Sequence, residues 1–112
     1  MTPPELLLAS LGSCAAYYAE QYLRARSLLD EGLHVIVTAE KAAAPARLER
    51  FHIAVNVPGL SDSRHIAGVR ISVERCLIHN TLLRPPSIEV RVSGAATLSD
   101  VSAEMGSVRL AS

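Results

Sequence analysis

Large aromatic side chains are nearly missing from this sequence of 112 residues. It has no tryptophan, one phenylalanine and three tyrosines, although 49% of its residues are hydrophobic. A core built from these residues must therefore be mainly aliphatic. The length is enough for one such core, so we expect a single domain.

Net charge and long apolar runs are missing too. Eleven basic side chains balance eleven acidic ones, and no basic stripe occurs, so we expect neither nucleic acid nor a membrane as a partner. The apolar run over residues 6–19 is interrupted by small polar residues and is shorter than the roughly 20 residues that a membrane span needs. No basic region precedes this run, so the sequence predicts no secretory signal and a cytoplasmic location.

A long helix is predicted from residue 3 to about residue 28. Thr2 is the expected N-cap, Pro3 takes the first helical position, and Glu5 completes a capping box with Thr2. The first half of this helix is apolar nearly all round, which predicts burial on most sides.

The rest of the chain predicts an α+β fold with two long helices packed with an antiparallel-rich sheet. Residues 33–39 and 51–57 alternate as strands of an antiparallel pair, and residues 87–93 alternate as a third strand. A second helix should start near residues 61–63 and stop at Pro85-Pro86, with Cys76 in its buried stripe. We expect a domain over residues 1–93 and a weakly structured tail over residues 94–112. The exposed sheet edges predict completion by a second copy of the chain.

The two cysteines, Cys14 and Cys76, each lie within an apolar helical pattern. In a reducing compartment such a pair favours redox chemistry over a structural cross-link, and inert buried packing is the alternative. His79 follows Cys76 by three residues, but a metal site with both thiols would lack a fourth ligand, so we expect no metal.

Two segments carry a family resemblance. Residues 2–14, TPPELLLASLGSC, and residues 74–82, ERCLIHNTL, resemble the two cysteine motifs of the OsmC/Ohr family (osmotically induced protein C and organic hydroperoxide resistance protein). The resemblance covers roughly residues 2–93 and implies the OsmC-like fold as an intertwined homodimer. It also implies a thiol-dependent peroxidase for organic hydroperoxides in oxidative stress defence. Such an enzyme has no metal or organic cofactor and takes electrons from an external dithiol or a lipoylated protein.

The resemblance assigns roles to individual residues. Cys14 corresponds to the peroxidatic cysteine and Cys76 to the resolving cysteine. The family glutamate matches Pro4, so Glu5 is the candidate for its role. Around Cys14, we expect Leu11, Tyr17 and Tyr18 to line a substrate pocket, with core or interface packing as the alternative for the two tyrosines.

Activation of Cys14 needs a cation. Cys14 lies about 18 Å along its helix, beyond the reach of the helix dipole, and apolar burial raises a thiol pKa. The family supplies an arginine from a β-meander ahead of the first helix, whereas this chain begins at that helix. We therefore expect an N-terminally truncated OsmC-like domain with impaired activity, in which Arg47, Arg50 or Arg75 are the available replacements. The alternative function is a non-catalytic OsmC-fold dimer that binds a small apolar ligand or acts as a structural module.

Overall fold

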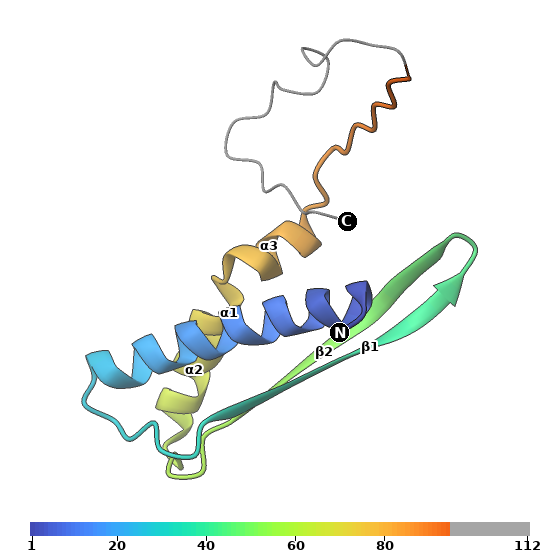
Figure 1. Ribbon diagram of the computed structural model, residues 1–112. Helices are drawn as coiled ribbons and strands as arrows, with labels where there is room; N and C mark the ends of the chain where they lie inside the picture. The colour runs from blue at the N-terminus through green and yellow to red at the C-terminus, as the bar shows by residue number, and fades with distance from the viewer. Residues whose placement is uncertain (95–112) are drawn as a thin grey trace.

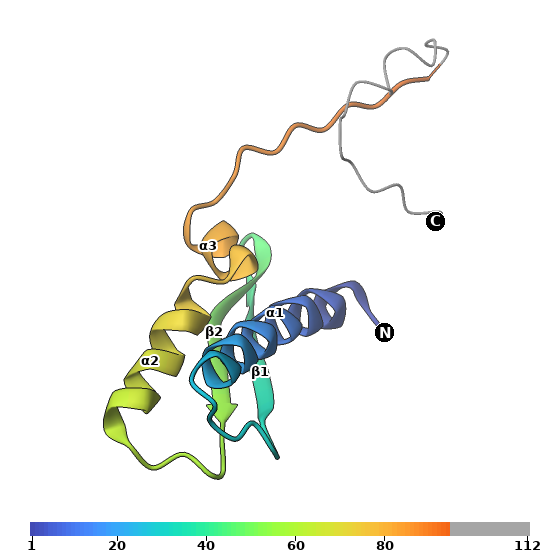
Figure 2. The ribbon, with the colours of Figure 1, turned by 90° about the vertical axis from the view of Figure 1, so that its left-hand side faces the viewer.

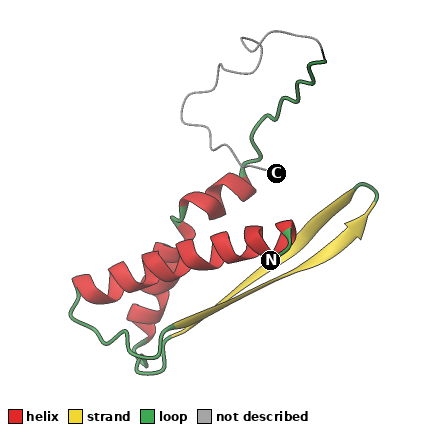
Figure 3. Ribbon diagram, viewed as in Figure 1, coloured by secondary structure: helices red, strands yellow, loops and turns green. Residues whose placement is uncertain are grey.

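The computed structural model describes residues 1–94, which form three helices and one β-hairpin. In chain order these are α1 (Pro3–Ala25), β1 (His34–Ala43), β2 (Ala46–Asn56), α2 (Ser63–Glu74) and α3 (Leu77–Leu83). Figure 1 shows α1 lying along the hairpin, with α2 crossing behind α1, and with α3 above α1 in this view. Figure 3 shows the helices gathered on one side of the two-stranded sheet. The predicted α+β class is confirmed.

The first helix begins as the sequence predicts. The Thr2 side chain accepts a hydrogen bond from the Glu5 N–H at 3.3 Å, and the Thr2 N–H donates to the Glu5 carboxylate at 2.9 Å. The capping box thus pairs two backbone groups that a helix start leaves open. The helix ends at Ala25, three residues before the predicted limit, and Ser27 follows in the left-handed region with φ 55°.

The hairpin is antiparallel, as predicted, and longer than the alternating residues indicate. Its register pairs His34 with Asn56 at the open end and Ala43 with Ala46 at the turn. Residues 41–43 and 46–48, which lie between the two alternating segments, also pair in the ladder. Gly12 lets α1 approach this sheet closely, because a Cβ there would lie 3.1 Å from Val37 Cγ2.

The core is aliphatic and centred on α1. Leu11, Ala15, Ala19 and Leu23 recur every four residues and are fully buried, which places them on one stripe of the helix. The last three of these pack with Val69 and Val73 of α2. The remaining surface of α1 is less covered than its all-round apolar sequence predicts, and Tyr17 is 59% exposed.

The second predicted helix is two helices, so the expectation of two long helices is wrong. The α2 helix ends at Glu74, and α3 begins after Cys76, whose backbone is extended with φ −58° and ψ 134°. Cys76 is therefore the N-cap of α3 and not a mid-helix residue. It is wholly buried at this break and its N–H donates to the Val73 carbonyl at 3.0 Å.

The third predicted strand does not form in the single chain. Residues 87–93 have no ladder partner within residues 1–94, and Figures 1 and 2 show this stretch leading away from the helices and the hairpin. A strand needs an adjacent edge to pair with, and no edge of this hairpin lies beside it. Of the predicted tail over residues 94–112, only Gly94 is among the described residues.

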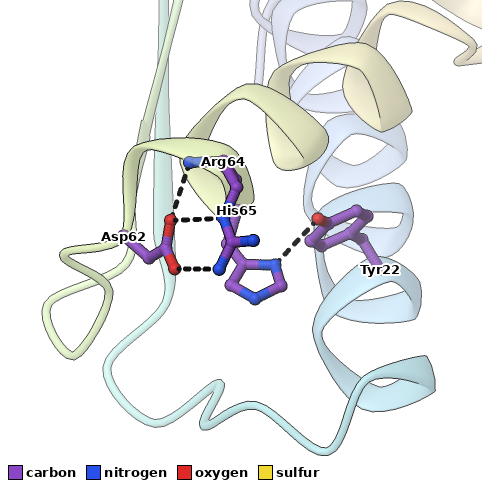
Figure 4. Close-up of polar contacts among 4 residues, drawn as sticks. All are labelled: Tyr22, Asp62, Arg64 and His65. Atoms are coloured by element: carbon purple, nitrogen blue, oxygen red, sulfur yellow. Dashed lines mark hydrogen bonds and ion pairs between the residues drawn. The ribbon is translucent and has the colours of Figure 1, made fainter.

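The contact between α1 and α2 includes a side-chain hydrogen bond. Figure 4 shows the Tyr22 hydroxyl joined to Nδ1 of His65 by a hydrogen bond of 3.0 Å, beside the Asp62 N-cap that accepts from the Arg64 N–H. The guanidinium of Arg26 lies over the tyrosine ring, 3.8 Å from the ring centroid. Tyr22 is thus held in place by two contacts.

We expect Gly68→Ala to destabilise the fold by about 1–3 kcal/mol, because its Cβ would overlap the hydroxyl and ring of Tyr22. In an open helix the same change stabilises by roughly 0.8–1 kcal/mol, so the expected sign is opposite to the helix propensity. Urea unfolding measures the effect. In a Tyr22→Ala background the penalty should disappear. A stabilising Gly68→Ala in the natural chain would mean that the two side chains do not meet.

Candidate active site

The two cysteines form a disulfide that joins α1 to the start of α3. Cys14 lies on α1 and is half-buried, whereas Cys76 has no exposed surface. Their Cα atoms are 6.0 Å apart, a separation at which a disulfide can close. The pair that the sequence singles out is therefore brought together by the fold, across 62 residues of chain.

Small side chains around Cys14 permit this approach. Ser13 and Ala15 flank it in the chain, Ala16 follows, and Ala15 is wholly buried, so α1 presents small side chains at this level. Since helix axes normally pack about 8–10 Å apart, a direct cysteine contact requires such a thin surface or a helix end. Here both conditions hold, because Cys76 lies at a helix end.

A cleft of about 1010 Å³ opens between β2 and the two C-terminal helices. Apolar side chains provide most of its wall, among them Phe51, Ile53, Val55, Val69 and Leu82. Leu11 and His79 also border it. Leu11 lies three residues before Cys14 and His79 three residues after Cys76, so the cleft reaches within one helical turn of each cysteine.

Of the three predicted pocket residues, Leu11 borders the cleft and the two tyrosines do not. Leu11 is buried and borders the cleft. Tyr17 and Tyr18 do not border it and instead pack edge to face on each other, with ring centroids 5.6 Å apart. The cleft is built mainly from β2, α2 and α3, which sequence position relative to Cys14 does not reveal.

Glu5 lies away from the cysteines. It precedes Cys14 by nine residues, which corresponds to about 14 Å along α1. Its carboxylate is bonded to the Thr2 N–H and to the Thr2 hydroxyl at 2.7 Å, and these hydrogen bonds lower the pKa of Glu5. In this chain Glu5 acts as a capping residue for α1.

A model of the family described as OsmC-like protein matches residues 1–91, which is most of the chain. The chain belongs to the OsmC-like protein family. The resemblance inferred from the two cysteine motifs is thereby confirmed.

A solved structure agrees with this assignment. The OsmC-like chain is similar to a protein from Psychrobacter arcticus 273-4 whose name refers to osmotic stress induction and a detoxification response. The sequences are 25% identical, the TM-score is 0.67, and the match covers 71% of this chain. The chain spans 58% of that protein's length. A comparison with curated proteins yields no match.

The arginines available to this OsmC-like site differ in their surroundings. Arg47 and Arg50 lie on the hairpin and pair with Glu49 at 3.5 Å and Glu40 at 3.4 Å. Arg75 precedes Cys76 directly, and none of the ion pairs within residues 1–94 includes it. Arg75 is therefore the cation that the chain places nearest in sequence to the disulfide.

Sequence reasoning underestimated His79. Its Nδ1 atom is buried and has no hydrogen-bond partner within the described part of the chain. The spacing of three residues between Cys76 and His79 is visible in the sequence. The predicted continuous helix through Cys76 did not place Cys76 at a helix start, three residues before His79. Within residues 1–94 no helix is long and apolar enough to cross a membrane.

Proposed function

We propose that this OsmC-like chain is a thiol-dependent peroxidase that reduces organic hydroperoxides. The observation that carries the proposal is the Cys14–Cys76 disulfide, which joins a half-buried and a wholly buried cysteine, each one helical turn from a residue that borders a large apolar cleft. Membership of a family with a stress-response relative supports it. The cytoplasmic location expected from the sequence is part of this proposal.

The proposed cycle has three steps. The Cys14 thiolate attacks the peroxide, an S–O bond forms, the O–O bond breaks, and the alkoxide leaves as an alcohol after taking a proton. The Cys76 sulfur then attacks the Cys14 sulfenic acid, so that the S–S bond forms and water leaves with the thiol proton. An external dithiol, free or on a lipoylated protein, reduces the disulfide and is itself oxidised.

The first step depends on a cation near Cys14. Partial burial among apolar side chains raises the pKa of a thiol, and the helix dipole acts only over the first turn of α1. Of the three replacement arginines, Arg75 is the one next in sequence to Cys76, whose sulfur is bonded to that of Cys14. This is the role that we propose for it.

Bulky apolar hydroperoxides should react faster than hydrogen peroxide by at least about tenfold. Burial of apolar surface contributes roughly 25 cal/mol per Å², so about 60 Å² of a cumyl group suffices for this factor. Stopped-flow or coupled assays with cumene hydroperoxide and hydrogen peroxide compare the second-order rate constants. Equal constants would contradict a role for the apolar cleft in substrate binding.

We also propose that the chain works as a homodimer. In the single chain Ile88, Val90 and Val92 share one side of an extended stretch and are 83%, 80% and 91% exposed. Both outer edges of the hairpin are open in the described chain. A second copy can cover these apolar side chains and pair with an open edge.

Sedimentation at micromolar concentration should give about twice the chain mass of 12.0 kDa. Val90→Lys should weaken the dimer roughly 10- to 100-fold, the equivalent of one buried valine. Glu89→Lys is the matched control, because it changes the charge of the same stretch on its other side. A folded single chain at this concentration, or equal effects of the two variants, would contradict the proposal.

A second function is favoured by the cleft itself. A volume of about 1010 Å³ with mainly apolar walls is typical of sites for small molecules. A non-catalytic OsmC-fold dimer that binds a small apolar ligand would keep this cleft and need no thiolate. Binding of such a ligand to a Cys14→Ser variant, with no peroxide consumption by the natural chain, would favour this alternative.

A further inference from the structure

Cys76 and His79 occupy two positions at the start of α3 whose side chains can meet. Cys76 is the N-cap and His79 is the third residue of the helix. In a capping box the side chain at this third position reaches back toward the N-cap residue, and here the Cys76 N–H already donates to the Val73 carbonyl, so Cys76 offers His79 its side chain. No side-chain cap is present at this helix start, so His79 and Cys76 are not engaged with other capping partners.

The imidazole of His79 has an unmet hydrogen bond. Its Nδ1 is buried and finds no partner in the described chain, and a buried polar atom without a partner costs roughly 1–3 kcal/mol. The disulfide offers no proton to this atom, because both sulfurs are bonded to each other. Reduction changes this, since Cys76 then carries an S–H group at the N-cap position.

We propose that His79 is the proton acceptor for the Cys76 thiol. In the reduced chain the thiol donates a hydrogen bond to Nδ1. In the oxidised chain Nδ1 has no partner in the described residues because the S–H group is absent. Its meaning for catalysis rests on the proposed peroxidase function. The proposed hydrogen bond between the two side chains does not depend on that function.

His79 would accept a proton in the resolving step of the cycle. When Cys76 attacks the Cys14 sulfenic acid, its S–H bond breaks and the proton moves to Nδ1 of His79. The S–O bond of the sulfenic acid breaks as the S–S bond forms. The leaving hydroxide then takes the proton from Nδ1 of His79 and departs as water. No other oxidant or reductant is needed in this step. A wholly buried thiol needs such an acceptor, because apolar burial opposes its ionisation.

Few other groups can take this role. The titratable and charged residues that border the cleft with His79 are Glu49 and His52 of β2 and Arg70 and Glu74 of α2. Arg75 precedes Cys76 in the chain as the C-cap of α2, and Cys14 is bonded to Cys76. Arg70 and Glu74 pair with each other at 3.7 Å, and Glu49 pairs with Arg47 at 3.5 Å. His52 is the second imidazole on the cleft and therefore the matched control.

The first test measures the ionisation of Cys76 alone. In a Cys14→Ser chain Cys76 is the sole thiol, and thiolate absorbance at 240 nm against pH reports its titration. His79→Gln in this background should reduce the thiolate fraction at pH 7 at least fivefold, because a thiolate next to a protonated histidine is stabilised. His52→Gln should leave the titration unchanged. An unchanged curve with His79→Gln, in a chain that circular dichroism shows to be folded, would overturn the inference.

The second test measures the resolving step. After one equivalent of cumene hydroperoxide, His79→Gln should form the disulfide at least tenfold more slowly than the natural chain below pH 7, with the difference shrinking as pH rises. A constant, pH-independent slowing would indicate a structural role and would overturn the inference. If no sulfenic acid forms in any variant, the proposed peroxidase function fails, while the thiolate titration still decides whether His79 and the Cys76 thiol interact.

His79→Asn separates the two roles of Nδ1, since it offers a hydrogen-bond acceptor that does not take up the proton. It should leave disulfide formation slow, and full recovery by His79→Asn would overturn proton transfer.

Discussion

Replacing Cys14 with serine should reduce hydroperoxide consumption by at least roughly a thousandfold, as expected when the nucleophile of a covalent mechanism is removed. Cys14 is the half-buried member of the pair, so it is the sulfur that a substrate from solution can reach. The rate of cumene hydroperoxide loss with excess dithiol measures the effect. Ser10→Ala, on an exposed position of the same helix, should retain full activity.

Cys76→Ser should behave differently from Cys14→Ser when cumene hydroperoxide is added without excess thiol. It should consume one equivalent of hydroperoxide per chain and then stop, with Cys14 held as sulfenic acid or oxidised further. Mass spectrometry before and after a sulfenic acid trap identifies the product. Continued turnover of Cys76→Ser at low thiol concentration would show that another group resolves the sulfenic acid.

Reduction of the disulfide should lower the free energy of unfolding by about 4 kcal/mol. The bond closes a loop over a sequence separation of 62 residues, and the chain-entropy model gives this magnitude for a loop of such length. For a domain of this size the loss corresponds to a fall in Tm of roughly 20 °C. Melting of the oxidised chain and of the chain kept reduced with a phosphine measures the difference.

The double variant Cys14→Ser/Cys76→Ser is the control for this effect. It should melt close to the reduced natural chain and should not respond to the phosphine. If the oxidised and reduced natural chains melted within a few degrees of each other, the disulfide would contribute little to stability. The fold would then depend mainly on the aliphatic core between α1 and α2.

Local patterns in the sequence predicted the parts of the fold that local interactions determine. The Thr2–Glu5 capping box, the hairpin and the Asp62 start of α2 all depend on neighbours within a few residues, and the structure contains each of them. The pairing of Cys14 with Cys76 followed from a family resemblance and not from spacing. The structure brings the two together through the contact of α1 with α3.

The features that sequence patterns missed depend on distant contacts. No glycine or proline marks the break at Cys76, because the residue that holds it there is Cys14 on another helix. The strand pattern over residues 87–93 is real as a pattern, but a strand forms only where an edge is available. The cleft was also missed, since residues of β2, α2 and α3 become neighbours only in the folded chain.

The unequal burial of the two cysteines determines which sulfur an incoming thiol attacks. Cys76 has no exposed surface, so a reductant reaches the bond from the side of Cys14. The mixed disulfide therefore forms on Cys14, and Cys76 departs as the leaving group into the interior. A second thiol of the reductant then frees Cys14. The regiochemistry of each reduction is thus set by how α1 and the start of α3 are packed, and not by the reductant.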